Sequence, residues 1–195
     1  GTDAIYLSLI SAGLKAGDKV GLTSSAAYYS SLALNRIGAI PIYFDISLSN
    51  YQLSLDELEK LKSGNIKFLI LTHLFGYLSN DIFQIVEFCK KNNSRICLDI
   101  SHAKLTCNYN DWDFEHYIRK VAPYTAHIHI SDSYGTDGEG VQVGEGEIDF
   151  TSMFKCLDKY CPNTSFIPEI WQGHKNFGSG FWYALNKLEK FQKII

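Results

Sequence analysis

The chain has 195 residues, 46% of them hydrophobic and 20% charged, and its 18 Lys and Arg against 21 Asp and Glu give a formal net charge of −3. This ordinary globular composition excludes a disordered, collagen-like or low-complexity chain. The slight negative charge disfavours a nucleic-acid partner, and no apolar run approaches the ~20 residues of a membrane-spanning helix, so we expect neither nucleic acid nor membrane as a partner.

Helices and strands are expected to alternate along the chain, because apolar residues at helical spacing alternate with short apolar runs. The first half predicts helices over 3–14, 26–37, 54–62 and 80–92 and strands over 19–23, 40–46, 68–73 and 95–99. The second half predicts helices over 111–121, 149–160 and 179–194 and strands over 126–130 and 166–170, with a loop at Ile100–Ala103.

These strands read as unbroken apolar runs, which is typical of strands buried on both faces. We therefore expect an α/β fold with a mainly parallel sheet and alternating helices. Ligands of such sheets bind beyond the carboxyl ends of the strands. The alternative for each polar residue at those ends is that strand ends are simply where polar sequence begins. The polar residues there are Thr23, Asp45, His73, Asp99, His102, His129, Asp132 and Glu169.

The five cysteines are odd in number and form no Cys-x-x-Cys pair. This pattern favours a reducing, cytoplasmic compartment over a disulfide scaffold. The sequence begins with Gly1 rather than Met, which predicts a processed chain or a fragment.

Six segments of the first half occur in the same order in one enzyme family. They are Gly1–Ala4, Ala16–Val20, Gly38–Pro41, Phe44–Ile46, His73–Gly76 and Leu98–Ala103. Through them, residues 1 to about 103 resemble the large domain of the DegT/DnrJ/EryC1/StrS sugar aminotransferases, which use pyridoxal phosphate.

This resemblance implies a set of cofactor-binding residues. A helix start suits a phosphate, because its free N–H groups and its dipole attract anions. A plain helix cap at Thr2 and a packing role for Tyr28 are the alternatives. By resemblance, Gly1, Thr2 and Asp3 would hold the phosphate, Tyr28 would stack on the ring, Asp99 would pair with the ring nitrogen, and His102 would replace the Gln or His that follows it.

The lysine that forms the Schiff base in this family has no counterpart in the sequence. The family places it downstream of the Asp-x-x-Gln/His segment, near Gly-Glu-Gly-Gly. Lys104 is too close to Asp99, and neither Lys155 nor Lys175 lies in a matching context. The family's small C-terminal domain is also missing from the sequence. Transamination is therefore not expected, because that reaction needs the lysine as its base.

Four segments resemble a second family, and they overlap the first set at strand 95–99. They are Ile96–Ala103, Ala122–Asp132, Val143–Phe150 and Ile167–Ile170. Through them, residues from about 96 to 195 resemble the C-terminal part of the sugar phosphate isomerase/epimerase proteins, which are xylose isomerase-like, AP-endonuclease-type TIM barrels.

The second resemblance implies a metal centre. Carboxylates and an imidazole that converge from several strand ends suit a divalent ion such as Mn²⁺, Mg²⁺ or Zn²⁺. By resemblance, Asp99, His129 and Glu169 are its ligands, and His102 and Glu169 are catalytic. Three neighbours keep two readings each: Asp132 orients the site or caps a loop, Glu145 lies at its mouth or forms a turn, and His127 lies in a neighbouring layer or only in the core.

The sequence departs from this second family at two points. The family's fourth ligand is a Glu on the strand before the Asp-x-x-His segment, but the corresponding strand, 68–73, ends in His73. The Asp-x-His of the AP-endonuclease branch is replaced by Gly138-Glu139-Gly140, so a three-metal DNA-repair site is not expected.

Taken together, the residues predict a metal-dependent sugar phosphate isomerase/epimerase-like protein that acts on a small sugar or sugar phosphate. It would be a fusion, a chimera or a fragment from bacterial carbohydrate biosynthesis, with a homodimer as one conceivable assembly. Three alternatives stay open: a pyridoxal-phosphate-binding module that lacks the Schiff-base lysine, a catalytically inactive composite, and one divergent α/β protein with two chance likenesses.

Overall fold

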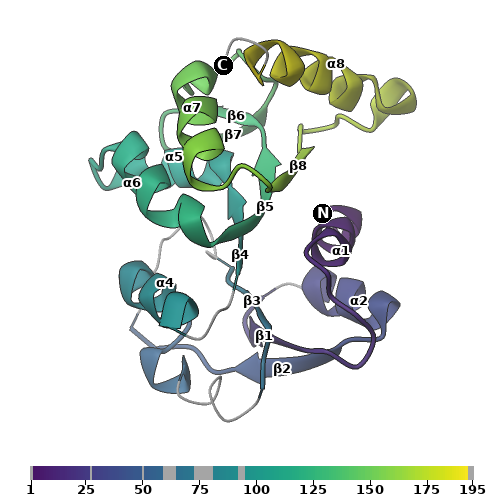
Figure 1. Cartoon of the computed structure of the whole chain (residues 1–195), viewed down its shortest axis with the longest axis vertical. Helices are drawn as coiled ribbons and strands as arrows, with labels where there is room; N and C mark the ends of the chain where they lie inside the picture. Colours follow the sequence, from purple (N-terminus) through teal and green to yellow (C-terminus); the bar gives the residue numbers. More distant parts are fainter. Residues whose placement is uncertain are drawn as a thin grey trace. The chain divides into compact units, whose positions relative to one another are not determined.

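The computed structural model describes residues 2–26, 28–49, 51–58, 65–72, 81–91 and 95–192. The chain divides into two compact units, Gly1–Cys97 and Leu98–Ile195 (Figure 1). Among the described residues, no helix is long and apolar enough to cross a membrane.

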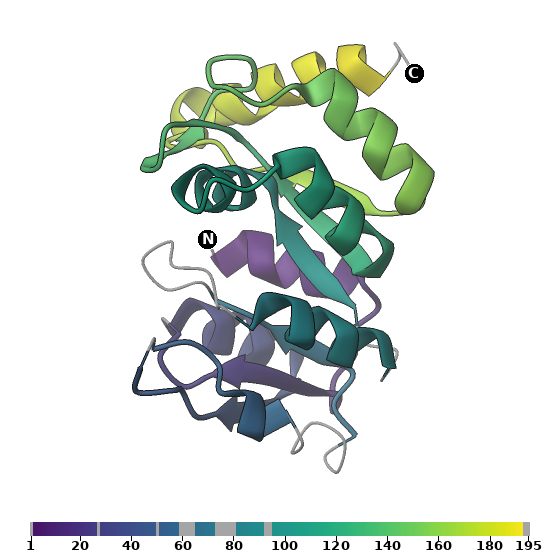
Figure 2. The same cartoon turned by 90° about the vertical axis from the view of Figure 1, so that its left-hand side faces the viewer.

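The first unit is built on a three-stranded parallel sheet in the order β2-β1-β3. Its strands are β1 (Lys19–Thr23), β2 (Ile40–Phe44) and β3 (Phe68–Ile70), and its helices are α1 (Thr2–Ser11), α2 (Tyr28–Ile37) and α4 (Ile82–Lys91) (Figures 1 and 2). Residues 55–58 are also helical.

Alternate residues of β3 belong to two separate hydrophobic clusters, because successive side chains of a strand point to opposite faces. Phe68 and Ile70 pack in a cluster with Leu9 of α1 and Leu34 of α2. Leu69 belongs to the cluster that includes Ile85 of α4. Burial on both faces explains why these strands read as continuous apolar runs.

The second unit holds a three-stranded sheet, a hairpin and the remaining helices. The sheet has the order β4-β5-β8, and β6 and β7 pair in an antiparallel hairpin. The strands are β4 (Ile96–Asp99, which crosses the boundary between the units), β5 (Thr125–Ile130), β6 (Asp132–Tyr134), β7 (Gly138–Val141) and β8 (Ser165–Pro168). The helices are α5 (Ile100–Tyr109), α6 (Phe114–Val121), the 3₁₀ turn η2 (Ala122–Tyr124), α7 (Phe150–Tyr160) and α8 (Lys175–Gln192).

The predicted α/β class with parallel strands and alternating helices is confirmed. Among the described residues, the six predicted strands form two three-stranded sheets, and an isolated parallel bridge pairs Phe68 of β3 with Arg95, the residue before β4. Ile46 lies beyond β2, in an isolated bridge with Leu53. His73 and the end of the helix predicted over 54–62 lie outside the described residues.

The prediction of a loop at Ile100–Ala103 was wrong, because these residues form the first turn of α5. Asp99 ends β4 and at once caps α5: its Oδ1 accepts a hydrogen bond from the His102 backbone N–H at 3.1 Å. Aspartate is among the preferred N-cap residues. The site residue Asp99 is thus held by the start of a helix rather than by a flexible connection.

Candidate metal centre

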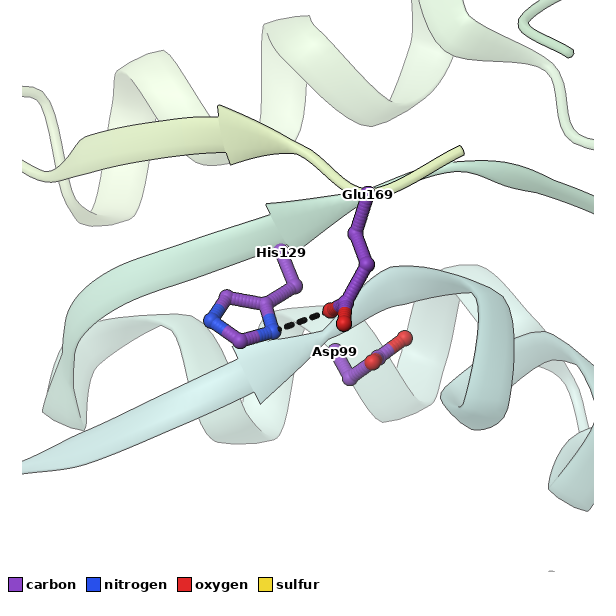
Figure 3. A group of neighbouring side chains, drawn as sticks. All are labelled: Asp99, His129 and Glu169. Carbon is purple, nitrogen blue, oxygen red and sulfur yellow. Dashed lines mark ion pairs between the residues drawn. The ribbon is translucent and has the colours of Figure 1, made fainter. Parts of the chain in front are cut away.

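Three side chains converge at the carboxyl ends of β4, β5 and β8 (Figure 3). Asp99 is the last residue of β4, His129 lies one residue before the end of β5, and Glu169 directly follows β8. One ligand atom from each side chain lies within 4.8 Å of the others. The arrows of the three strands point the same way in Figure 3, so their carboxyl ends meet at one edge.

The strand register explains why Glu169 reaches His129. In the parallel pair of β5 and β8, His129 lies opposite Ile167 and Ile130 lies opposite Pro168. The Glu169 backbone N–H then donates to the Ile130 carbonyl at 2.9 Å, which extends the pairing by one bond. Glu169 therefore lies directly after the last paired residues of β5 and β8, and its side chain points toward His129 and Asp99 (Figure 3).

The cluster holds two carboxylates in different electrostatic surroundings. His129 Nδ1 lies 2.5 Å from Glu169 Oε2. Burial alone would raise the pKa of Glu169, but the hydrogen bond and charge of His129 outweigh it and hold that pKa below its usual value. Burial raises the pKa of Asp99, against the opposing effect of His102 and His129.

These donor groups fit a divalent cation. Two ligands of one ion, each ~2.0–2.6 Å from it, lie at most ~4–5 Å apart, which is close to the spread of the three donor atoms here. The side chains are partly shielded, since His129 is 11% exposed and Glu169 37%. A cation would also offset the cost of charging Asp99 at a site where burial raises its pKa.

His102 lies at the margin of this cluster. Its Nε2 is 3.9 Å from Asp99 Oδ2, and its Nδ1 is 3.5 Å from Oε2 of Glu139 on β7. Sequence reasoning missed Glu139 as a site residue, because the β6–β7 hairpin that carries it was not predicted. The position of Glu139 between two glycines is the sequence feature that could have pointed to it. The catalytic role assigned to His102 stays a prediction.

Asp132 caps a loop, which is one of the two roles expected for it. The carboxylate is fully buried and accepts four backbone hydrogen bonds at 2.9–3.1 Å. A Cβ at Gly146 would lie 2.3 Å from the Ser133 carbonyl oxygen, so the loop closes this tightly only with glycine there. The donors are the N–H groups of Ser133, Gly144, Gly146 and Ile148.

Most residues predicted to bind pyridoxal phosphate belong to the first unit. Thr2 and Asp3 begin α1, and the Asp3 carboxylate pairs with Arg36 of α2. Tyr28 begins α2, is 67% exposed and contacts the Tyr29 ring at 4.5 Å between centroids. Gly1 lies outside the described residues. Asp99 and His102 belong to the second unit. The cofactor roles of all these residues stay predictions.

Curated relatives resemble the chain over about half its length. GDP-perosamine synthase of Escherichia coli O157:H7 is 32% identical over 104 residues, which are 53% of this chain and 28% of that protein. The 3-oxo-glucose-6-phosphate:glutamate aminotransferase of Bacillus subtilis (strain 168) is 33% identical over 76 residues, which are 39% of this chain and 17% of that protein. The chain thus spans less than a third of either relative.

A solved structure with a similar segment is NtdA from Bacillus subtilis with bound cofactor PMP. It is 28% identical, with a TM-score of 0.45 over 49% of this chain and 22% of that one. The curated relatives bear out the predicted resemblance to sugar aminotransferases over about half the chain.

A family model for the xylose isomerase-like TIM barrel matches residues 43–185. The match begins well before residue 96, where this resemblance was expected to start, and it includes Asp99, His129 and Glu169. Since it covers most of the sequence, the chain belongs to the xylose isomerase-like TIM barrel family.

Proposed function

We propose that the second unit binds a divalent metal ion between Asp99, His129 and Glu169 and uses it in the isomerisation or epimerisation of a small sugar. The supporting observation is the convergence of the three side chains, from three separate strand ends, to within 4.8 Å. Oxygen and imidazole ligands of this kind suit Mn²⁺, Mg²⁺ or Zn²⁺.

The surrounding residues have distinct roles in this proposal. When bound, the ion would polarise a carbonyl or hydroxyl oxygen of the sugar. The pKa of Glu169, held low beside His129, keeps this carboxylate ionised, as a metal ligand must be. As a carboxylate of the site, Glu169 would also move the proton of the sugar. His102, 44% exposed at the margin of the cluster, would hold or move a proton at Nε2, the ring nitrogen that faces Asp99.

Calorimetric titration of the full chain with Mn²⁺, Mg²⁺ and Zn²⁺ tests the proposal. Asp99→Asn removes one charge but keeps a residue that caps helices well, so the fold should survive. We expect one saturable site in the parent protein and at least ~10-fold weaker binding in Asp99→Asn.

Asp113→Asn is the matched control. Asp113 caps α6 just as Asp99 caps α5, with its Oδ1 accepting from the His116 backbone N–H at 2.5 Å, but it lies outside the cluster. This variant should bind the ions as the parent does. A parent protein without saturable binding, or an Asp99→Asn variant with parental affinity, would refute the metal centre.

The relatives favour a second candidate function, a pyridoxal-phosphate-binding module of the sugar aminotransferase type. The curated matches support this reading at least as well as they support the isomerase, because one is named as an aminotransferase of a sugar phosphate. No lysine in the sequence matches the family's Schiff-base position. The module would therefore bind the cofactor reversibly.

Borohydride reduction separates binding from transamination. The chain is mixed with pyridoxal phosphate, reduced and digested, and its peptides are mapped. We expect no single labelled lysine, since an internal aldimine needs an ε-amine placed at the ring aldehyde. One specifically labelled lysine would support a transaminase function. If pyridoxal phosphate does not raise the melting temperature of the chain, the proposed cofactor binding is refuted.

A further inference from the structure

An open cleft of about 500 Å³ lies beside the metal cluster in the second unit. Glu139 lines it and also contacts His102, while Ile170 and Trp171, which follow Glu169, form part of its wall. The cleft therefore adjoins the cluster on the side of His102. Pockets with aromatic walls and a few polar groups are the usual binding sites for small molecules.

Hydrogen bonds join the two walls of this cleft. The Trp171 backbone N–H donates to the Gly140 carbonyl of β7 at 2.7 Å, and the Gln142 side-chain amide donates to the Gly180 carbonyl of α8 at 3.1 Å. These contacts cross between the hairpin side and the helix side. The cleft is thus largely formed before any ligand arrives.

Two of the three charged side chains that line the cleft are acidic. Its charged residues are Glu139, Glu145 and Lys175. The Lys175 ammonium donates to the Gln172 side-chain oxygen at 2.7 Å, whereas the described residues give the Glu145 carboxylate no hydrogen-bond partner. Lys187, outside the lining, donates to the Val143 carbonyl at 2.7 Å.

The start of α8, which lines the cleft, is a poor site for a phosphate. Residues 176–178 have left-handed backbone angles, with φ of 50°, 59° and 80°, so their N–H groups do not form a regular helix N-terminus. The Ser179 hydroxyl donates to the Lys175 carbonyl at 3.3 Å. The backbone N–H groups of Lys175 and Gly178 are also engaged, since they donate to the carbonyls of Gln172 and His174 at 3.0 and 3.1 Å.

We propose that this cleft binds an amino sugar, with the sugar's ammonium group held by Glu139 and Glu145, and that it disfavours a sugar phosphate. Trp171, 75% exposed in the wall, offers an aromatic face that also attracts an ammonium group. That this amino sugar is the substrate of the metal centre rests on the proposed function; its binding to the cleft does not.

Ligand-observed NMR titrations of the full chain with glucosamine, glucose and glucose 6-phosphate test this inference. At low salt we expect glucosamine to bind on the order of fivefold more tightly than glucose, as two exposed carboxylates would provide, and glucose 6-phosphate to bind weakest. High salt should shrink the preference, because exposed charges are screened.

Variants assign the preference to the cleft. Glu139→Gln combined with Glu145→Gln should equalise glucosamine and glucose, while Glu189→Gln, on α8 outside the cleft lining, should keep the parental preference. The inference is overturned if glucose 6-phosphate binds as tightly as glucosamine, if the preference survives the double substitution, or if no sugar binds.

A Mn²⁺ titration of the same samples separates this inference from the proposed function. If the parent protein binds no Mn²⁺ but prefers glucosamine through the two carboxylates, the metal centre is refuted and the cleft remains an amino-sugar site. Normal Mn²⁺ binding with no such preference refutes the cleft inference alone.

Discussion

At the scale of single residues, Asp132 fixes the loop that carries Glu145. Its two carboxylate oxygens accept the N–H groups of Ser133, Gly144, Gly146 and Ile148 in a fully buried position. A buried acceptor of this kind is costly to replace, because the donors it satisfies are left without partners.

We predict that Asp132→Asn destabilises the protein by about 2–4 kcal/mol, since the new NH₂ group would face two backbone donors. Urea unfolding followed by circular dichroism measures this change. Asp137→Asn, in the exposed turn of the hairpin, should stay within about 0.5 kcal/mol of the parent. An Asp132→Asn variant as stable as that control would contradict the role assigned to Asp132.

His127 is a buried histidine of β5, two residues before His129. It is 4% exposed, its Nδ1 lies 2.8 Å from the Ser165 hydroxyl, and its ring meets the His129 ring edge-on at 5.5 Å. Burial, together with the nearby charge of His129, lowers its pKa to about 4. The side chain therefore belongs to the core, one of the two readings open from the sequence.

This lowered pKa makes the stability depend on pH. Between about pH 6.5 and 4 the unfolded chain binds a proton at His127 that the folded chain does not, so the stability from this group is present above pH 6.5 and lost on acidification. The loss is on the order of 3 kcal/mol. We predict that His127→Asn flattens the fall in unfolding free energy over this range, and that His116→Asn, exposed on α6, leaves it unchanged. Parallel curves for His127→Asn and the parent would refute the assignment.

At the scale of elements, aspartates set the starts of three helices in the second unit. Asp99, Asp113 and Asp149 cap α5, α6 and α7, each by accepting the backbone N–H three residues on. An acceptor at this position satisfies one of the free donors of the first helical turn. These caps place α5 directly behind the strand that ends in Asp99.

Asp149→Ala should cost about 1 kcal/mol of stability, because it removes the cap of α7. The Ser152 N–H and hydroxyl hydrogen bonds lower the pKa of Asp149, so this stabilisation is present above the ordinary Asp pKa and is lost as the pH falls below it. Asp158→Ala, within the same helix, should not destabilise, since alanine favours helix. Equal losses in both variants, measured by thermal unfolding at neutral pH, would count against the cap.

The sequence predicts most elements but not all of them. Apolar periodicity locates the helices and strands on both sides of Asp99, and strand-end polarity points to Asp99, His129 and Glu169. It misses α5, whose Ser, Thr and Asn residues weaken the helical pattern, and the short β6–β7 hairpin, whose shape depends on Asp132 and on a register irregularity. Strand partners depend on contacts far apart in sequence, so the division into two sheets could not be predicted.

At the scale of the whole molecule, the chain joins two compact units whose boundary, between residues 97 and 98, falls within β4. The segment Leu98–Ala103 carries sequence motifs of both families. We propose that the crossover between an aminotransferase-like segment and an isomerase-like segment lies there. The carboxylate of Asp99 would have a role in either family, as a metal ligand or as a partner of a ring nitrogen.

The most direct test of the metal centre is a crystal structure of the full chain grown with Mn²⁺ and measured for anomalous scattering. We predict one anomalous peak bounded by Asp99, His129 and Glu169, with ligand distances of ~2.0–2.6 Å. The same crystals of Asp99→Asn should lose that peak. A parent crystal with no peak among these three side chains, at Mn²⁺ concentrations that saturate other manganese proteins, would contradict the central claim.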